Sequence, residues 1–190
     1  MDTNLAYREE VWEELIDGKI VAISPRPAVS HSRVSSNIFS IFSPYLKGKR
    51  CEYFPDGVDL YLSEKEQYIP DGMVVCDPNK VKKNGVHGSP DLVVEILSPG
   101  TVKNDRIHKK SVYEYSGVGE YWIVDPVSKS VEQYILKDKK YDLRDIFIVY
   151  PDWMLEKMKD EEKAAIVTEF RCSLYDDLII KLDDIFYRVD

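Results

Sequence analysis

Hydrophobic and polar positions alternate along this chain in short runs, whose period changes between that of a strand and that of a helix. After Ser30, which we expect to be an N-cap, apolar side chains recur at helical spacing until the chain reaches Gly48. Runs with the two-residue period of strands follow, at Val58–Leu62, Tyr68–Cys76 and Asp91–Leu97. A polar loop separates the last two of these runs.

The same reading predicts elements on both sides of this region. Gly18 would end a helix before it, and Gly117 would end a helix after it. The expected helices are Arg8–Asp17, Val102–Tyr115 and Trp153–Lys163, and the expected strands are Lys19–Ile23, Tyr121–Val124, Val131–Leu136 and Arg144–Tyr150, with a last turn at Asp183–Phe186. Interleaved strands and helices predict an α/β fold with a central mixed β-sheet flanked by α-helices.

The length of 190 residues predicts one domain, with a less typical acidic extension over residues 152–190. Three scattered cysteines, Cys51, Cys76 and Cys172, argue against a disulfide framework and a thiolate zinc site, and favour small core residues in a reducing compartment. The polar N-terminus and the lack of a long apolar run predict no secretion signal and no membrane span. We therefore expect a cytoplasmic protein.

The net charge of −8 is unfavourable for a protein that binds nucleic acid, because phosphate contacts call for basic side chains. The distribution of charge weakens this objection. The extension carries a net −5, from 11 acidic and 6 basic residues, whereas residues 1–151 carry only −3, from 23 acidic and 20 basic residues. Some of these acids are also candidate metal ligands, whose charge a bound cation would offset.

Two acids stand in strand-like surroundings. Glu95 lies between Val94 and Ile96, and a carboxylate is costly to bury there unless it is paired or coordinated. Asp71 precedes the apolar run MVVC. Carboxylates from neighbouring strands suit a hard divalent cation. The alternatives are a turn or cap role for Asp71 and an edge position or lysine pairing for Glu95.

A polar stripe is expected on the helix that follows. Asp105, Lys109 and Tyr113 fall at successive four-residue intervals, so Asp105 would orient Lys109 and Lys109 would point toward the carboxylates. An ammonium group there could orient a metal-bound water or stabilise charge on phosphate. The alternative is a solvated ion pair between Asp105 and Lys109.

Supporting residues are less sharply defined. His31 lies on the apolar face of its helix, either as a satisfied core histidine or as a group that contacts phosphate. Glu14 would add a metal contact or lie at a surface helix end. His87 and His108 are expected at the surface, and the three histidines form no zinc motif.

Six sequence strings cover most of residues 14–135. In chain order they are ELIDGKI, HSRVSSNI, YIPDGMVV, SPDLVVEILSPGT, DRIHKKSVYEYSGVGEYWIVDP and VEQYI. With them the chain resembles the Uma-type endonucleases, a branch of the PD-(D/E)XK restriction-endonuclease-like superfamily. The resemblance implies that Asp71 and Glu95 are the metal-binding acids. It also implies that the lysine comes from Lys109 on the helix, because Leu97 occupies the usual lysine position.

These observations together predict a Mg²⁺- or Mn²⁺-dependent nuclease that cuts nucleic acid, with DNA as the first expectation. Asp71, Glu95 and Lys109 would be catalytic, with support from His31, Glu14, Asp105 and Tyr113. A homodimer is plausible because two sites can share the cutting of a duplex. The alternatives are a catalytically idle module that binds nucleic acid or protein, and a metal-dependent hydrolase of a small phosphorylated substrate.

Overall fold

A mixed central sheet forms the body of the molecule in this computed structural model, which describes residues 12–23 and 27–190. The strand order is β12-β11-β10-β9-β6-β3, and β9 runs parallel to β10 while the other neighbours are antiparallel. The strands are β3 (Glu52–Pro55), β6 (Gly72–Val75), β9 (Leu92–Ile96), β10 (Glu120–Asp125), β11 (Ser130–Lys137) and β12 (Lys140–Ile148). The predicted mixed α/β architecture is confirmed.

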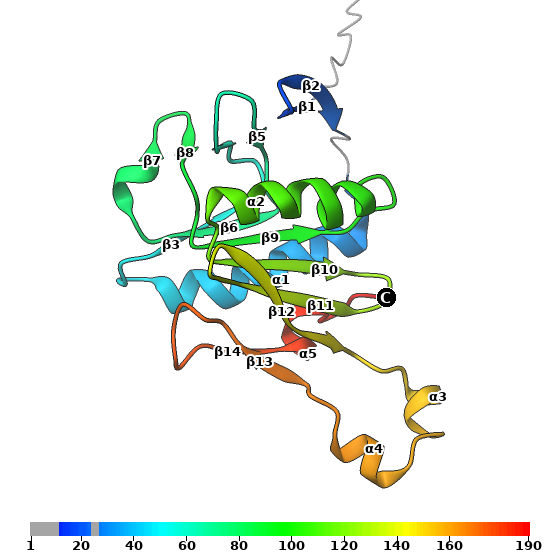
Figure 1. Ribbon diagram of the computed structural model, residues 1–190. Helices are drawn as coiled ribbons and strands as arrows, with labels where there is room; N and C mark the ends of the chain where they lie inside the picture. The colour runs from blue at the N-terminus through cyan, green and yellow to red at the C-terminus, as the bar shows by residue number, and fades with distance from the viewer. Residues whose placement is uncertain (1–11, 24–26) are drawn as a thin grey trace, which may run out of the picture.

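Three hairpin-like segments build a second sheet, in the order β2-β1-β5-β4-β8-β7. Its strands are β1 (Trp12–Ile16), β2 (Lys19–Ile23), β4 (Leu60–Tyr61), β5 (Gln67–Tyr68), β7 (Val81–Lys82) and β8 (Gly85–His87). These segments project from the same side of the central sheet as α2 (Figure 1). A separate pair, β13 (Glu169–Arg171) and β14 (Ile179–Lys181), lies near the C-terminus.

Helices cover both faces of the central sheet (Figure 1). On one face lies α2, and on the other lie α1 and α5. The helices are α1 (Val29–Leu46), α2 (Lys110–Ser116), α3 (Asp152–Leu155), α4 (Asp160–Ala164) and α5 (Leu182–Ile185), with a 3-10 turn η1 (Pro78–Lys80) and a π-helical turn η2 (Asn104–Lys109) that leads into α2. Within the described part of the chain, no helix has the length and apolar character needed to cross a membrane.

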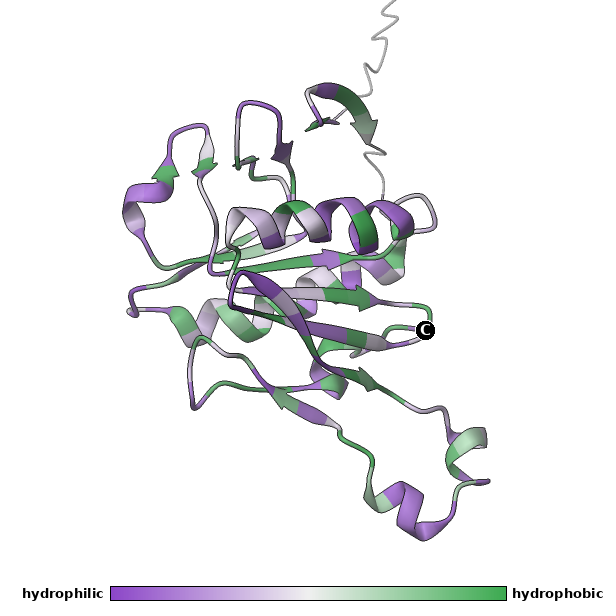
Figure 2. Cartoon of the chain, in the orientation of Figure 1, coloured by the Kyte–Doolittle hydropathy of each residue, from purple (hydrophilic) through white to green (hydrophobic). Residues whose placement is uncertain are grey.

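Strand alternation divides the core into two clusters, one on each face of the sheet. Val94 and Ile96 pack toward α1, whereas Val93 packs toward α2. Glu95 follows the parity of Val93, as the sequence predicted, and therefore enters the core on the α2 side. The central strands β6 and β9 are mainly hydrophobic, while α4 is hydrophilic (Figure 2).

The C-terminal segment adds side chains to the α1-side cluster. Phe170, Cys172 and Ile180 are buried there. Glu120 on β10 fixes this segment, because its Oε2 accepts hydrogen bonds from the backbone N–H and the hydroxyl of Ser173, at 2.8 and 2.5 Å. The N-terminal acidic part of the extension, with α3 and α4, instead projects away from the sheet (Figure 1).

The prediction of a helix at Arg8–Asp17 is wrong for its described part. Trp12–Ile16 is β1, which pairs with β2, and residues 8–11 lie outside the described residues. Asp17 and Gly18 both have positive φ, 51° and 74°, as a two-residue hairpin turn of the primed type requires. An Asp-Gly pair between apolar runs is a signal of such a hairpin, whereas the helix prediction rests on Gly18 as a helix stop.

Other boundaries also differ from the prediction. Ala28, not Ser30, is the N-cap of α1, and it makes no side-chain capping bond. The expected helix Trp153–Lys163 is broken into α3 and α4. The expected strand Tyr68–Cys76 contains the last residue of β5 and the whole of β6, with a gap between them. No expected strand covers β3, β7, β8, β13 or β14, which have only two to four residues each and therefore show little periodicity of their own.

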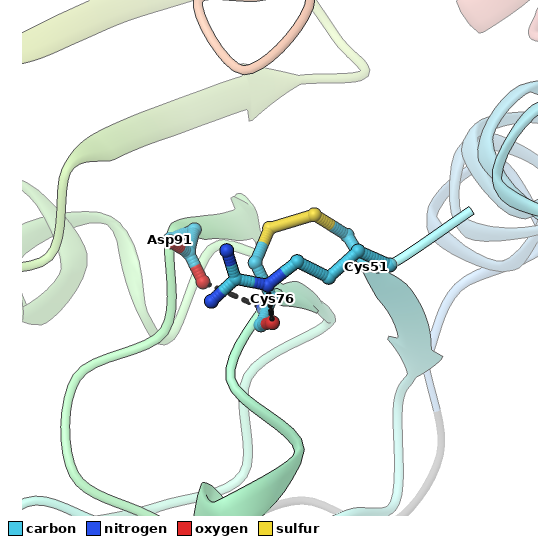
Figure 3. The surroundings of a disulfide bond; sticks show 4 residues. Cys51, Cys76 and Asp91 are labelled. Carbon is cyan, nitrogen blue, oxygen red and sulfur yellow. Dashed lines mark hydrogen bonds between the residues drawn. A yellow bond between two sulfur atoms is a disulfide. The ribbon is translucent and has the colours of Figure 1, made fainter.

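The expectation of unpaired cysteines is wrong, because Cys51 and Cys76 form a disulfide (Figure 3). Glu52 pairs with Val75 in the β3–β6 ladder, so the cysteines one position beyond lie opposite one another. The Cys76 N–H also donates to Asp91 Oδ2 at 2.7 Å. Cys172 is buried and free, as expected. The bridge removes the argument that the cysteines gave for a reducing compartment.

Candidate active site

Glu95 is the centre of a buried polar cluster on the α2 side of the sheet. Its side chain is nearly inaccessible, and β9 carries it between apolar neighbours. Oε1 of Glu95 accepts hydrogen bonds from Lys109 Nζ at 3.1 Å and from the Tyr113 hydroxyl at 2.6 Å. Both contacts use the same oxygen, and Oε2 takes part in no hydrogen bond among the described residues. Glu95 Oε2 is therefore the oxygen best suited to a metal ion.

Lys109 is surrounded by carboxylates. Its Nζ lies 2.8 Å from Glu14 Oε1 and 3.8 Å from Asp105 Oδ1, in addition to Glu95. Helical spacing brings Asp105 and Lys109 together, as the sequence predicted, but both are buried, so the solvated ion pair is excluded. Glu14 arrives from the β1–β2 hairpin and also accepts the Ile69 N–H at 3.2 Å. The alternative prediction, that Glu14 lies at a surface helix end, is wrong.

Asp71 lies beside Glu95 across the β6–β9 ladder. Gly72 pairs with Val94, so Asp71 lies opposite Glu95 when the register is extended by one residue. Asp71 Oδ2 accepts the Ile96 N–H at 2.6 Å. His31 Nε2, from α1, lies 3.1 Å from Asp71 Oδ1. The inward-facing histidine therefore binds an acid of the candidate site.

The charges around Lys109 shift the pKa values of several groups. Burial disfavours the ammonium form of Lys109, but Glu95, Glu14 and Asp105 outweigh it and raise the Lys109 pKa. Burial also raises the pKa of Glu95 well above its ordinary value; Lys109 opposes the rise, and the neighbouring acids add to it. The pKa of Asp105 is raised to about 6, mainly by burial. One lysine thus faces more negative charge than it neutralises, and a divalent cation would relieve the excess.

His31 and Tyr113 respond to the same acids. Burial lowers the pKa of His31, but its hydrogen bond to Asp71 and the Asp71 charge give a net rise. Burial and then Glu95 raise the pKa of Tyr113 well above its ordinary value, so Tyr113 remains a hydrogen-bond donor.

Sequence reasoning missed Asp56, an exposed residue just after β3. Pro55 pairs with Gly72, so Asp56 lies opposite Asp71 when that register is extended. Partial desolvation and then the charge of Asp71 raise the Asp56 pKa. A signal was present, because the tripeptide Pro-Asp-Gly occurs at both 55–57 and 70–72. The two copies place acids at the neighbouring ends of β3 and β6.

Access to the cluster is uneven. Glu14, Glu95 and Lys109 are at most 4% exposed. The side chains of His31 and Asp71 are 11% and 15% exposed. Solvent therefore reaches the candidate site from the Asp71 side, whereas Lys109 is buried beside Glu14 of the β1–β2 hairpin.

A second group of potential ligands lies where the hairpins meet η2. One side-chain ligand atom from each of Asp17, Glu66 and His108 lies within 4.8 Å of the other two. His108, expected at the surface, is partly buried, and its Nε2 lies 3.7 Å from Glu66 Oε2. His87 is exposed, as predicted. Asp17, Glu66 and His108 all lie outside the cluster of Asp71 and Glu95.

Comparison with known proteins agrees with this architecture. A crystal structure described as that of a "putative nuclease belonging to DUF820" from Anabaena variabilis superposes with a TM-score of 0.68 at 22% identity, covering 92% of this chain and 89% of that one. At this identity the likeness concerns the fold alone, and it agrees with the mixed α/β architecture.

The family follows from sequence. A family model, Uma2, described as "putative restriction endonuclease", matches residues 4–163. An uncharacterized protein of Synechocystis sp. is 30% identical over 133 residues, which cover 69% of this chain and 70% of that protein. The chain belongs to the Uma2 family, and the resemblance inferred from its motifs is confirmed.

Proposed function

We propose that this protein is a divalent-metal-dependent endonuclease that hydrolyses phosphodiester bonds of nucleic acid, with DNA as the first substrate to test. One observation carries the proposal: a buried ammonium, Lys109, bonded to Glu95, with Asp71 opposite Glu95 on the adjoining strand. Membership of the Uma2 family supports the same chemistry.

The donor set fits a Mg²⁺ or Mn²⁺ ion. Asp71 and Glu95 would hold it through carboxylate oxygens, the ligand type that these hard cations prefer. When bound, such an ion polarises a phosphoryl oxygen and lowers the pKa of a coordinated water. The negative excess around Lys109 supports this assignment, because a cation would lower the pKa of Glu95 and keep its carboxylate charged.

The chain's own groups would then orient the reactants. Glu14 and Glu95 hold the Lys109 ammonium in place by hydrogen bonds, and its remaining proton can point toward an attacking water or a phosphate oxygen. Tyr113 fixes the Glu95 carboxylate through Oε1. His31 and the Ile96 N–H hold the two oxygens of Asp71. A second copy of the chain would supply a second site for the other strand of a duplex.

The test compares the wild type with Asp71→Asn, Glu95→Gln and Lys109→Met on supercoiled plasmid DNA, with Mg²⁺, Mn²⁺ or EDTA. We expect metal-dependent cleavage that falls by about a hundredfold or more in each variant. Glu132→Gln, a carboxylate that pairs with Arg106 instead, serves as the control. Equal rates in all proteins would reject the assignment.

The burial of Glu95 and Lys109 favours a second candidate, a metal-dependent hydrolase of a small phosphorylated substrate. A small phosphate ester can reach buried groups more easily than a nucleic-acid duplex can. The same proteins are therefore assayed on 4-nitrophenyl phosphate. Metal-dependent turnover of this monoester, without cleavage of DNA or RNA, would select the second candidate.

A further inference from the structure

The β7–β8 hairpin concentrates positive charge in an acidic protein. Residues 80–88 contain three lysines and no acid, although the chain has a net charge of −8. Lys82 and Lys83 are exposed, and within the described residues neither forms an ion pair. Lys80 is engaged differently, since its Nζ donates to the Ser89 carbonyl at 2.6 Å. Two lysines at the hairpin tip are thus available to an anionic partner.

The base of this hairpin is firmly held. Val86 is completely buried, and its N–H donates to the Asp59 carbonyl at 2.8 Å. The Gly88 N–H donates to the Tyr61 carbonyl at 2.8 Å, next to the parallel pairing of β4 with β8. Gly85 has φ +135° and lies so close to the Asp59 carbonyl that a side chain would collide with it. The lysines are therefore presented from a fixed backbone.

An aromatic pair joins the hairpin to β4. The rings of His87 and Tyr61 stack with centroids 4.5 Å apart and an angle of 15°. His87 is exposed, and its Nε2 is 3.1 Å from Asn84 Oδ1, which fixes the ring. Tyr61 covers one face of the imidazole, so the other face can receive a planar group. Unpaired bases stack on such rings in single-stranded nucleic-acid sites.

The hairpin packs on the same face of the sheet as the candidate active site. Val86 and Tyr113 belong to one core cluster, and β7–β8 projects on the α2 side (Figure 1). The chain continues from the hairpin through residues 88–91 into β9, which carries Glu95. One face of the sheet therefore carries both the hairpin and the candidate site.

We propose that the β7–β8 hairpin binds a single-stranded segment of the nucleic-acid substrate, with Lys82 and Lys83 on phosphates and His87, backed by Tyr61, stacked on an unpaired base. This inference rests on the proposed function for its substrate, and it names the part of the chain that holds that substrate. The acidic net charge is then no obstacle, because binding is confined to one basic element.

Binding is measured by fluorescence anisotropy with a labelled DNA single strand of about 20 nucleotides and a duplex of the same length, with Ca²⁺ in place of Mg²⁺. For Lys82→Glu/Lys83→Glu we expect at least tenfold weaker binding of both DNAs. We also expect the slope of log K against log salt for the single strand to fall by about 1.4, since each phosphate contact contributes about 0.7. For His87→Ala we expect about fivefold or greater weakening for the single strand and little change for the duplex.

The matched control is Lys47→Glu/Lys139→Glu, which makes the same charge change at two exposed lysines outside the hairpin. It should bind within twofold of the wild type. If Lys82→Glu/Lys83→Glu binds like this control, or if the wild type binds neither DNA, the proposal is overturned. An unchanged single-strand affinity for His87→Ala rejects the stacking contact.

A small chromogenic diester, bis(4-nitrophenyl) phosphate, separates this inference from the proposed function. The hairpin variants should hydrolyse it at the wild-type rate while losing activity on DNA. If the wild type hydrolyses neither substrate and the hairpin variants still lose DNA binding, the result supports binding by the hairpin and rejects the nuclease activity. Equal thermal unfolding of all variants excludes misfolding as the cause.

Discussion

Glu14 Oε1 lies 2.8 Å from Lys109 Nζ, closer than the 3.1 Å that separates this ammonium from Glu95 Oε1. The shortest ion pair in the candidate site thus joins the first hairpin to the helix that follows β9. It makes the β1–β2 hairpin part of the site, although sequence periodicity placed Glu14 on a helix. Glu14 can therefore act by orienting Lys109 as well as by contacting a metal.

Replacing Glu14 by Gln separates these two roles. A glutamine oxygen can still accept the Ile69 N–H, but it carries no charge to hold Lys109. If Glu14 is a positioning residue, Glu14→Gln should lower kcat about tenfold and leave the Mg²⁺ concentration for half-maximal rate within twofold of the wild type. A metal ligand would instead raise that concentration strongly. The exposed neighbour Glu13 provides the control Glu13→Gln.

The pKa of Asp105 predicts a pH-dependent stability. Because folding raises this pKa from 3.8 to about 6, the folded state binds more protons than the unfolded state between those values. The contribution of Asp105 to the free energy of unfolding must therefore fall as pH rises through this window. Relative to the wild type, Asp105→Asn should gain stability from pH 4 to pH 6, measured by urea unfolding. A constant difference between the two proteins would contradict the shift.

Gly72 follows Asp71 and packs against Tyr53. A Cβ at this position would approach the hydroxyl and lie 2.8 Å from Cζ of Tyr53, whose ring is stacked on Phe42. We expect Gly72→Ala to lower the free energy of unfolding by about 1–3 kcal/mol, with a smaller loss when it is combined with Tyr53→Phe. Gly100→Ala is the control, because no atom lies within 4 Å of its added Cβ. Equal stability of the two alanine variants would disprove the clash.

Glu120 connects the central sheet to the C-terminal segment. Its Oε1 accepts hydrogen bonds from Trp122 Nε1 and Gln133 Nε2, both at 2.6 Å, and its Oε2 accepts from Ser173. Glu120→Ala removes the acceptor of the buried Trp122 and Gln133 donors and should cost about 3 kcal/mol or more of the free energy of unfolding. Amide hydrogen exchange should accelerate most around Ser173.

The control for that variant is Glu169→Ala, at an exposed position of β13. Its effect should stay within about 0.5 kcal/mol. Similar losses for the two variants would show that the Glu120 network contributes little.

The sequence alone determined the elements that have enough residues to show a period. The face of Glu95 followed from strand alternation, and the approach of Asp105 to Lys109 followed from helical spacing. Both are local regularities of the backbone, so they can be read without knowledge of the rest of the chain.

Only the tertiary structure decided which distant segments meet. It turned Trp12–Ile16 into a strand, brought Glu14 to Lys109, set Asp56 opposite Asp71 and joined Cys51 to Cys76. Strand pairing and burial are long-range, and the free energy of packing a hairpin against η2 outweighs the weak helix preference of a few residues. Composition and spacing do not encode such contacts, which is why the face of Glu95 and the approach of Asp105 to Lys109 could be predicted but not the full set of their partners.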